Sequence, residues 1–187
     1  LASAAFYRCG RKDAKSIGEC SGEARSQTLS ESAALRLKER IRGEALYQQG
    51  QFAVDRLGHL EEALLCPQRA YTVVIDAANV AYHGQNFSGG HFSYQQIEAV
   101  RRHLEDRGER PLIILSPRYM LNSSYVSPRG SERGPDAMPG SKLGKLAETD
   151  LDLRRQWDEN DQAFQTPMSA NDDLYWLYAT LVEIPDA

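Results

Sequence analysis

Two short apolar runs with an amphipathic segment between them constrain the fold more than any other feature of the sequence. Tyr71–Ile75 and Pro111–Leu115 are rich in Val, Ile and Leu, and runs of this length and composition are typical of buried strands. Residues 93–107 carry apolar side chains on one stripe of a helix. Strand, helix and strand in this order form a βαβ unit, which predicts a parallel sheet covered by helices.

The rest of the chain adds helices and one more strand to this unit. Apolar periodicity predicts helices over 29–49, 52–65 and 146–160, a short strand over 163–166 and a helix from residue 172. Residues 1–28 are a loop-rich entry, and residues 116–144 collect Ser, Pro and Gly, which predicts an exposed, poorly ordered loop. We therefore expect an α/β fold with three layers, divided into an N-terminal region (1–69) and a sheet-containing domain (70–187).

Composition excludes some classes of protein. The chain has 187 residues, of which 41% are hydrophobic and 26% charged, and a net charge of −4. These values fit a globular protein and argue against a uniformly basic nucleic-acid coat. Basic residues gather at positions 8–42, where they form either a solvated face or a local surface for phosphates. No apolar run is long enough to cross a bilayer, and three cysteines are too few for a disulfide scaffold.

Three carboxylates are placed where α/β proteins bind ligands. Asp76 ends the first strand, and Asp172 and Asp173 open the last helix, with Ser169 or Asn171 as its N-cap. The aspartate pair either decorates a helix start or joins Asp76 at the carboxyl edge of the sheet. Like charges raise one another's pKa unless a cation lies between them, and oxygen ligands favour Mg²⁺ or Mn²⁺. Such a site suits phosphodiester hydrolysis.

Two motifs give this pattern a specific resemblance. The first is Val-Ile-Asp-Ala-Ala-Asn-Val-Ala at 74–81, followed by Tyr-His-Gly-Gln-Asn-Phe at 82–87. The second is Asn-Asp-Asp-Leu-Tyr-Trp-Leu-Tyr-Ala at 171–179. Together they resemble the protein-only RNase P family, whose nuclease domain is PIN-like and of the NYN type, and the resemblance covers about residues 52–182.

The resemblance implies a metal-dependent endoribonuclease that removes the 5′ leader of precursor tRNA. Asp76, Asp172 and Asp173 match the family's metal-binding positions, and Asn79 matches an asparagine that orients a carboxylate or water. The implied partner is RNA, with no membrane and no obligate protein partner. The implied location is intracellular, and the sequence does not choose among mitochondrion, chloroplast and nucleus.

This chain also departs from the family. Ala77 replaces a glycine and Leu174 a tryptophan, and the family's further aspartate, in a Thr-Asn-Asp sequence, has no match before Ala187. Cys9 matches half of a zinc-binding Cys-x-x-Cys pair whose other position is Phe6, so residues 1–69 hold at most a degenerate zinc-linked module and a closed zinc site is not expected. We therefore expect a fragment that is truncated at both ends, with an incomplete sheet, and that cuts slowly or not at all.

Two other functions compete with this one. The first is an NYN-type ribonuclease that acts on another RNA, such as messenger RNA. The second is a non-catalytic RNA-binding or vestigial product.

Overall fold

The computed structural model describes residues 6–8, 29–85, 91–120, 123–125, 142–168 and 170–183. Its centre is a four-stranded sheet in the order β1-β2-β3-β6. The strands are β1 (Phe6–Arg8), β2 (Val73–Asp76), β3 (Pro111–Leu115) and β6 (Ala163–Gln165). Strands β2, β3 and β6 are parallel, whereas β1 pairs antiparallel with β2. The predicted parallel sheet is therefore confirmed.

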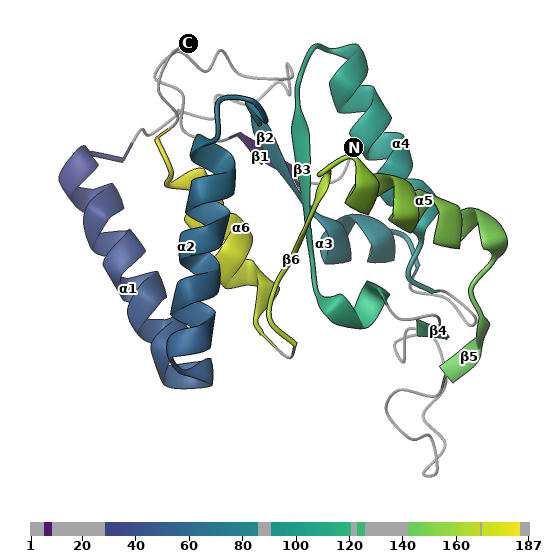
Figure 1. The fold of residues 1–187 in the computed structure, drawn as a ribbon, viewed down its shortest axis with the longest axis horizontal. Helices are drawn as coiled ribbons and strands as arrows, with labels where there is room; N and C mark the ends of the chain where they lie inside the picture. The colour runs from purple at the N-terminus through teal and green to yellow at the C-terminus, as the bar shows by residue number, and fades with distance from the viewer. Residues whose placement is uncertain are drawn as a thin grey trace.

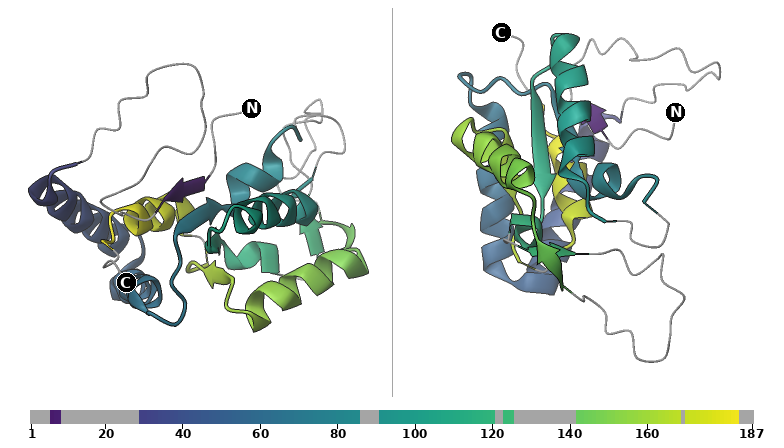
Figure 2. Two further views of the ribbon diagram at one scale, coloured as in Figure 1. Left: turned by 90° about the horizontal axis from the view of Figure 1, so that it is seen from above. Right: turned by 90° about the vertical axis from the view of Figure 1, so that its right-hand side faces the viewer.

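Helices cover both faces of the sheet, which gives three layers (Figures 1 and 2). One face is covered by α1 (Glu31–Gln49), α2 (Gln51–Leu65) and α6 (Asp172–Thr180). The other is covered by α3 (Ala77–Tyr82), α4 (Tyr94–Asp106) and α5 (Glu148–Glu159). No helix among these ranges is both long enough and apolar enough to span a membrane.

Alternation along the strands builds one apolar core on each face. Successive strand residues point to opposite faces of a sheet. Val74, Leu112, Ile114 and Phe164 pack against α1, α2 and α6, whereas Val73, Ile75, Ile113 and Leu115 pack against α3, α4 and α5. Every residue of β2 and β3 is buried, which explains why these strands read as continuous apolar runs in the sequence.

Two short elements differ from the predictions. Helix α3 begins directly after Asp76, in a stretch where the sequence pattern predicted no helix, because six residues are too few for a helical period to be recognised. Strand β1 lies in the predicted loop-rich entry, and its pairing is a tertiary contact that the local sequence does not encode. The cysteine at position 9 lies outside the described residues.

The prediction of a poorly ordered loop over residues 116–144 was wrong at both ends of this range. It begins with a 3₁₀ helix, η1 (Pro117–Met120), in which Tyr119 is buried. Strands β4 (Ser123–Tyr125) and β5 (Lys142–Lys145) then form an antiparallel pair. Residues 126–141 lie outside the described part of the chain.

Helices α1 and α2 share a core with the sheet. Ile41 from α1 and Leu57 from α2 belong to the same apolar cluster as Val74 of β2. The predicted division of the chain at residue 69 stays a prediction. In the basic run at 8–42, Lys38 and Arg42 both pair with Glu61 of α2, so these two cations hold helices together.

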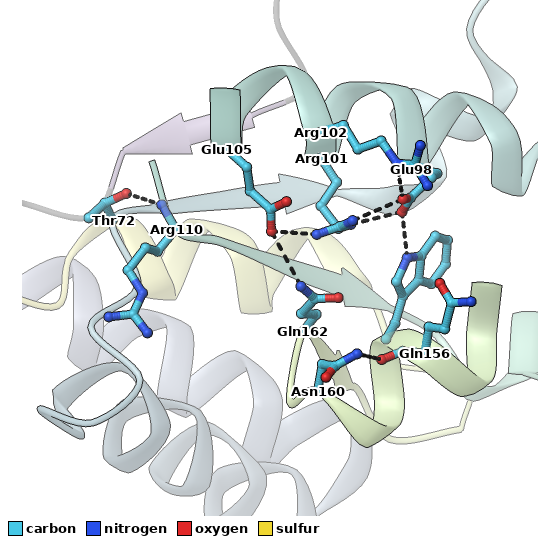
Figure 3. A network of polar contacts seen from close by, with 10 residues as sticks. Thr72, Glu98, Arg101, Arg102, Glu105, Arg110, Gln156, Asn160 and Gln162 are labelled. Atoms are coloured by element: carbon cyan, nitrogen blue, oxygen red, sulfur yellow. Dashed lines mark hydrogen bonds and ion pairs between the residues drawn. The ribbon is translucent and has the colours of Figure 1, made fainter. Parts of the chain in front are cut away.

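A buried carboxylate joins α4 to α5 (Figure 3). Glu98 is 5% exposed and accepts hydrogen bonds from Arg101, Arg102 and the indole of Trp157 at 2.6–2.9 Å. Burial alone would raise the pKa of Glu98, but these hydrogen bonds and the charge of Arg101 outweigh it and lower the pKa to about 2. The ionised Glu98 therefore stabilises the packing of the two helices.

Glu98→Gln should reduce the free energy of unfolding at pH 7 by about 3 kcal/mol, because it removes one partner of a buried charge network. The folded pKa is lower than the ordinary value of 4.5, so this stabilisation is present above that value and is lost as the pH falls toward 2. Urea unfolding at pH 7 and pH 3 measures it. Glu105→Gln, which removes the more exposed partner of Arg101, is the control and should cost less than about 1 kcal/mol. Equal costs for the two variants would contradict this account.

Candidate active site

Asp76 lies at the carboxyl end of β2 and is the N-cap of α3. It is 2% exposed. Its Oδ1 accepts the backbone N–H of Asn79 at 3.1 Å, and its Oδ2 accepts the Asn79 side-chain amide at 2.5 Å. Asn79 therefore fixes the orientation of this buried carboxylate through both of its oxygens.

The aspartate pair forms the first turn of α6. Asn171 is the N-cap, and its side chain accepts the backbone N–H of Asp173 at 3.2 Å. Ser169, the other predicted cap, lies outside the described residues. Asp172 is half-buried and Asp173 is exposed, and Oδ1 of Asp173 accepts the indole N–H of Trp176 at 3.1 Å. The position of Asp173 is thus set by its own helix.

Parallel pairing brings Asp76 and the start of α6 to one edge of the sheet. Asp76 is opposite Ile114 of β3, and Leu115, the next residue of β3, is opposite Gln165 of β6. The carboxyl ends of β2, β3 and β6 therefore share an edge. Helix α6 begins soon after β6 and packs against β2 and β3. Figure 1 shows β3 and β6 running toward the lower edge of the view, where α6 starts.

Burial and neighbouring charge act together on two of these carboxylates, Asp76 and Asp172. Burial raises the pKa of Asp76, the hydrogen bonds from Asn79 lower it, and the charges of Asp172 and Asp173 raise it again. Burial also raises the pKa of Asp172, as does the charge of Asp173, whereas Arg118 lowers it. Negative charge is therefore concentrated at this edge at a cost in free energy.

The donor chemistry at this edge fits a hard divalent cation. Three carboxylates supply the oxygen ligands that Mg²⁺ and Mn²⁺ prefer, and a cation beside them would offset both their burial and their mutual repulsion. Among the described residues, however, no three His, Cys, Asp or Glu side chains lie close enough together to hold a metal ion. The metal role of Asp76, Asp172 and Asp173 therefore stays a prediction.

The sequence reasoning missed the residues that follow β3. Ser116 is fully buried, and Arg118 of η1 is exposed near Asp172. The ring of Tyr119 stacks on that of Phe92 with a centroid distance of 4.0 Å and makes an edge contact with the ring of Tyr82 at a centroid distance of 6.2 Å. Their position in the sequence could have identified them. They directly follow the second predicted strand, whose carboxyl end lies at the same edge of the sheet as Asp76.

Comparison with known proteins supports the resemblance in the motifs. No protein-family profile matches the chain. Proteinaceous RNase P 3 and proteinaceous RNase P 2 of Arabidopsis thaliana are each 30% identical to it over 112 residues, 58% of this chain. The chain spans only 16% and 17% of the length of these two relatives.

The solved structures show the same likeness in three dimensions. A crystal structure of nuclear proteinaceous RNase P 2 from A. thaliana matches with a TM-score of 0.54 and 23% identity, covering 82% of this chain and 27% of that chain. A second structure of that protein gives a TM-score of 0.56 at the same identity and coverage. At this identity the structural match shows a shared fold. The resemblance to protein-only RNase P is thus confirmed.

Replacing Asp76 by Asn should leave the fold equally or more stable at pH 7. Asn caps a helix about as well as Asp, and it removes a charge whose pKa is raised by burial and by two neighbouring carboxylates. Because the folded pKa lies above the ordinary value of 3.8, the native carboxyl stabilises the fold below that value, and this stabilisation is lost as the pH rises through the folded pKa. The advantage of the Asn variant should therefore be absent below pH 3.8.

The matched control is Asp76→Ala, which also removes the charge but leaves Asn79 without its acceptor. It should be about 1 kcal/mol less stable than the Asn variant. Thermal and urea unfolding of the three proteins measure both differences. A wild-type chain more stable at pH 7 than Asp76→Asn would contradict the burial argument.

Proposed function

We propose that this chain is a metal-dependent endoribonuclease of the protein-only RNase P type, which removes the 5′ leader of precursor tRNA. The observation that carries the proposal is that Asp76 ends β2 and that Asp172 and Asp173 open α6, which packs against β2 and β3 of the parallel sheet. The fold shared with nuclear proteinaceous RNase P 2 and the sequence similarity to proteinaceous RNase P 2 and 3 support the choice of reaction.

A divalent cation, Mg²⁺ or Mn²⁺, is the proposed cofactor, with Asp76, Asp172 and Asp173 as its ligands. When bound, it supplies an activated water and stabilises the charge on the leaving oxygen of the phosphodiester. All three proposed ligands are carboxylates, which supply the oxygen donors that Mg²⁺ and Mn²⁺ prefer, and in the described structure these side chains would have to move closer together to hold the ion.

The neighbouring residues of this chain hold those carboxylates in place. Asn79 fixes both oxygens of Asp76, so that the carboxylate keeps one orientation while it is ionised. Trp176 holds Oδ1 of Asp173, which leaves its second oxygen for a ligand. In metal sites, residues that orient the ligands in this way contribute about 10- to 100-fold to affinity or activity. We therefore assign Asn79 and Trp176 positioning roles.

The experiment is a single-turnover cleavage assay on a precursor tRNA with the 187-residue chain in large excess. We expect slow Mg²⁺-dependent release of the 5′ leader, and a fall of at least about 100-fold in the rate for Asp76→Asn and for Asp173→Asn. Binding of the RNA should change by less than about threefold, because the Lys and Arg contacts to phosphate supply the affinity. Asp161→Asn, a substitution of an exposed aspartate that ends the turn after α5, is the control and should cleave like wild type.

A second arm keeps a negative result informative. The matching region of proteinaceous RNase P 2 is replaced by that of this chain, and the chimera is assayed with and without Asp76→Asn. An inactive chimera that still binds precursor tRNA would contradict the nuclease proposal and support a non-catalytic RNA-binding protein. Cleavage of messenger RNA with no action on precursor tRNA would instead support an NYN-type ribonuclease with another substrate.

A further inference from the structure

An arginine leaves the sheet at the same edge as the three carboxylates. Strand β3 ends at Leu115, one residue beyond the partner of Asp76, and η1 begins at Pro117. Arg118 is therefore placed by the strand that lies between β2 and β6. Its side chain is exposed.

Neighbouring residues fix the position of the Arg118 guanidinium. Its Nε donates to Oγ of the buried Ser116 at 3.1 Å, and its guanidinium carbon lies 5.6 Å from the centroid of the Tyr119 ring. Tyr119 is itself fixed, since it stacks on Phe92 and its carbonyl accepts the hydroxyl of Tyr94. Such support lowers the entropy cost of binding a ligand through this side chain.

The outer part of the guanidinium has no described partner. Within the described ranges, no carboxylate lies within ion-pair distance of Arg118, and its terminal nitrogens make no hydrogen bond to protein. Arg101 differs, since it pairs with both Glu98 and Glu105. Arg118 thus presents a forked set of donors to solvent near Asp172 at the start of α6.

We propose that Arg118 binds the two non-bridging oxygens of a phosphate of RNA whose backbone lies at the edge of the sheet that holds Asp76. This inference rests on the proposed function and adds a phosphate-binding residue to it. A phosphodiester that approaches this edge meets three carboxylates, and a cation is needed to offset that repulsion. The guanidinium matches two phosphate oxygens at once, which a lysine ammonium cannot do.

The test measures binding of a precursor tRNA by fluorescence anisotropy over a range of salt concentrations, at constant Mg²⁺. The full chain carries Asp76→Asn, so that the RNA stays intact. Adding Arg118→Ala should weaken binding about 5- to 10-fold and reduce the slope of log K against log salt by about one. Arg118→Lys keeps the charge, so it should keep the slope while binding less tightly than arginine.

Arg107→Ala is the matched control. Arg107 is exposed at the end of α4, which leads into the amino end of β3, the opposite edge of the sheet. This variant should bind with the affinity and slope of its parent. Damage to the fold could also weaken binding by Arg118→Ala. In that case the thermal unfolding temperature of this variant would fall, and Arg118→Lys would show the same reduced slope. Either result would overturn the inference.

The outcomes separate this inference from the proposed function. A chain that binds no precursor tRNA, with arginine at position 118, would overturn both. A chain that binds RNA equally well with Arg118→Ala and Arg107→Ala would overturn the inference alone. The inference would be supported if the slope of log K against log salt fell by about one in Arg118→Ala but stayed unchanged in Arg107→Ala and in Arg118→Lys.

Discussion

The parallel pairing of β2, β3 and β6 is the constraint on which the rest of the structure depends. It buries both faces of the sheet, so each face needs its own set of helices. It also makes all three strands end at one edge, where Asp76 is buried and bonded to Asn79. The layered fold and the acidic edge therefore have the same origin.

The concentration of negative charge at the carboxyl edge of the sheet reduces the stability of the fold. Asp76 is almost fully buried, and two neighbouring carboxylates raise its pKa further. Glu98 is buried to a similar degree, but two arginines and an indole hold its pKa at about 2. Two arginines of the protein thus balance the charge of Glu98. Among the described residues, no arginine or lysine pairs with Asp76 in this way, and such an uncompensated carboxylate is common at functional sites.

Sequence reasoning placed the sheet strands β2 and β3, Asp76 at the end of β2, and Asp172 and Asp173 at the start of α6, because these features depend on local signals. The apolar run before Asp76 and the cap before Asp172 can be read directly from the chain. Helix α3 was missed because six residues carry no recognisable period. Arg118 was missed because its proposed role depends on its tertiary neighbour Asp172 and not on a motif. The hydrogen bond between Trp176 and Asp173 depends on side-chain rotamers, which sequence patterns do not specify.

The central claim is that Asp76 and the start of α6 bind one cation together, and Tb³⁺ luminescence excited through tryptophan tests it most directly. Trp176 contacts Asp173, so an ion bound there should accept energy from its indole. We expect emission that Mg²⁺ displaces, that Trp176→Phe abolishes and that either Asp76→Asn or Asp173→Asn strongly reduces. Emission that survives Asp76→Asn together with Asp173→Asn, or no Tb³⁺ binding to the wild-type chain, would contradict the claim.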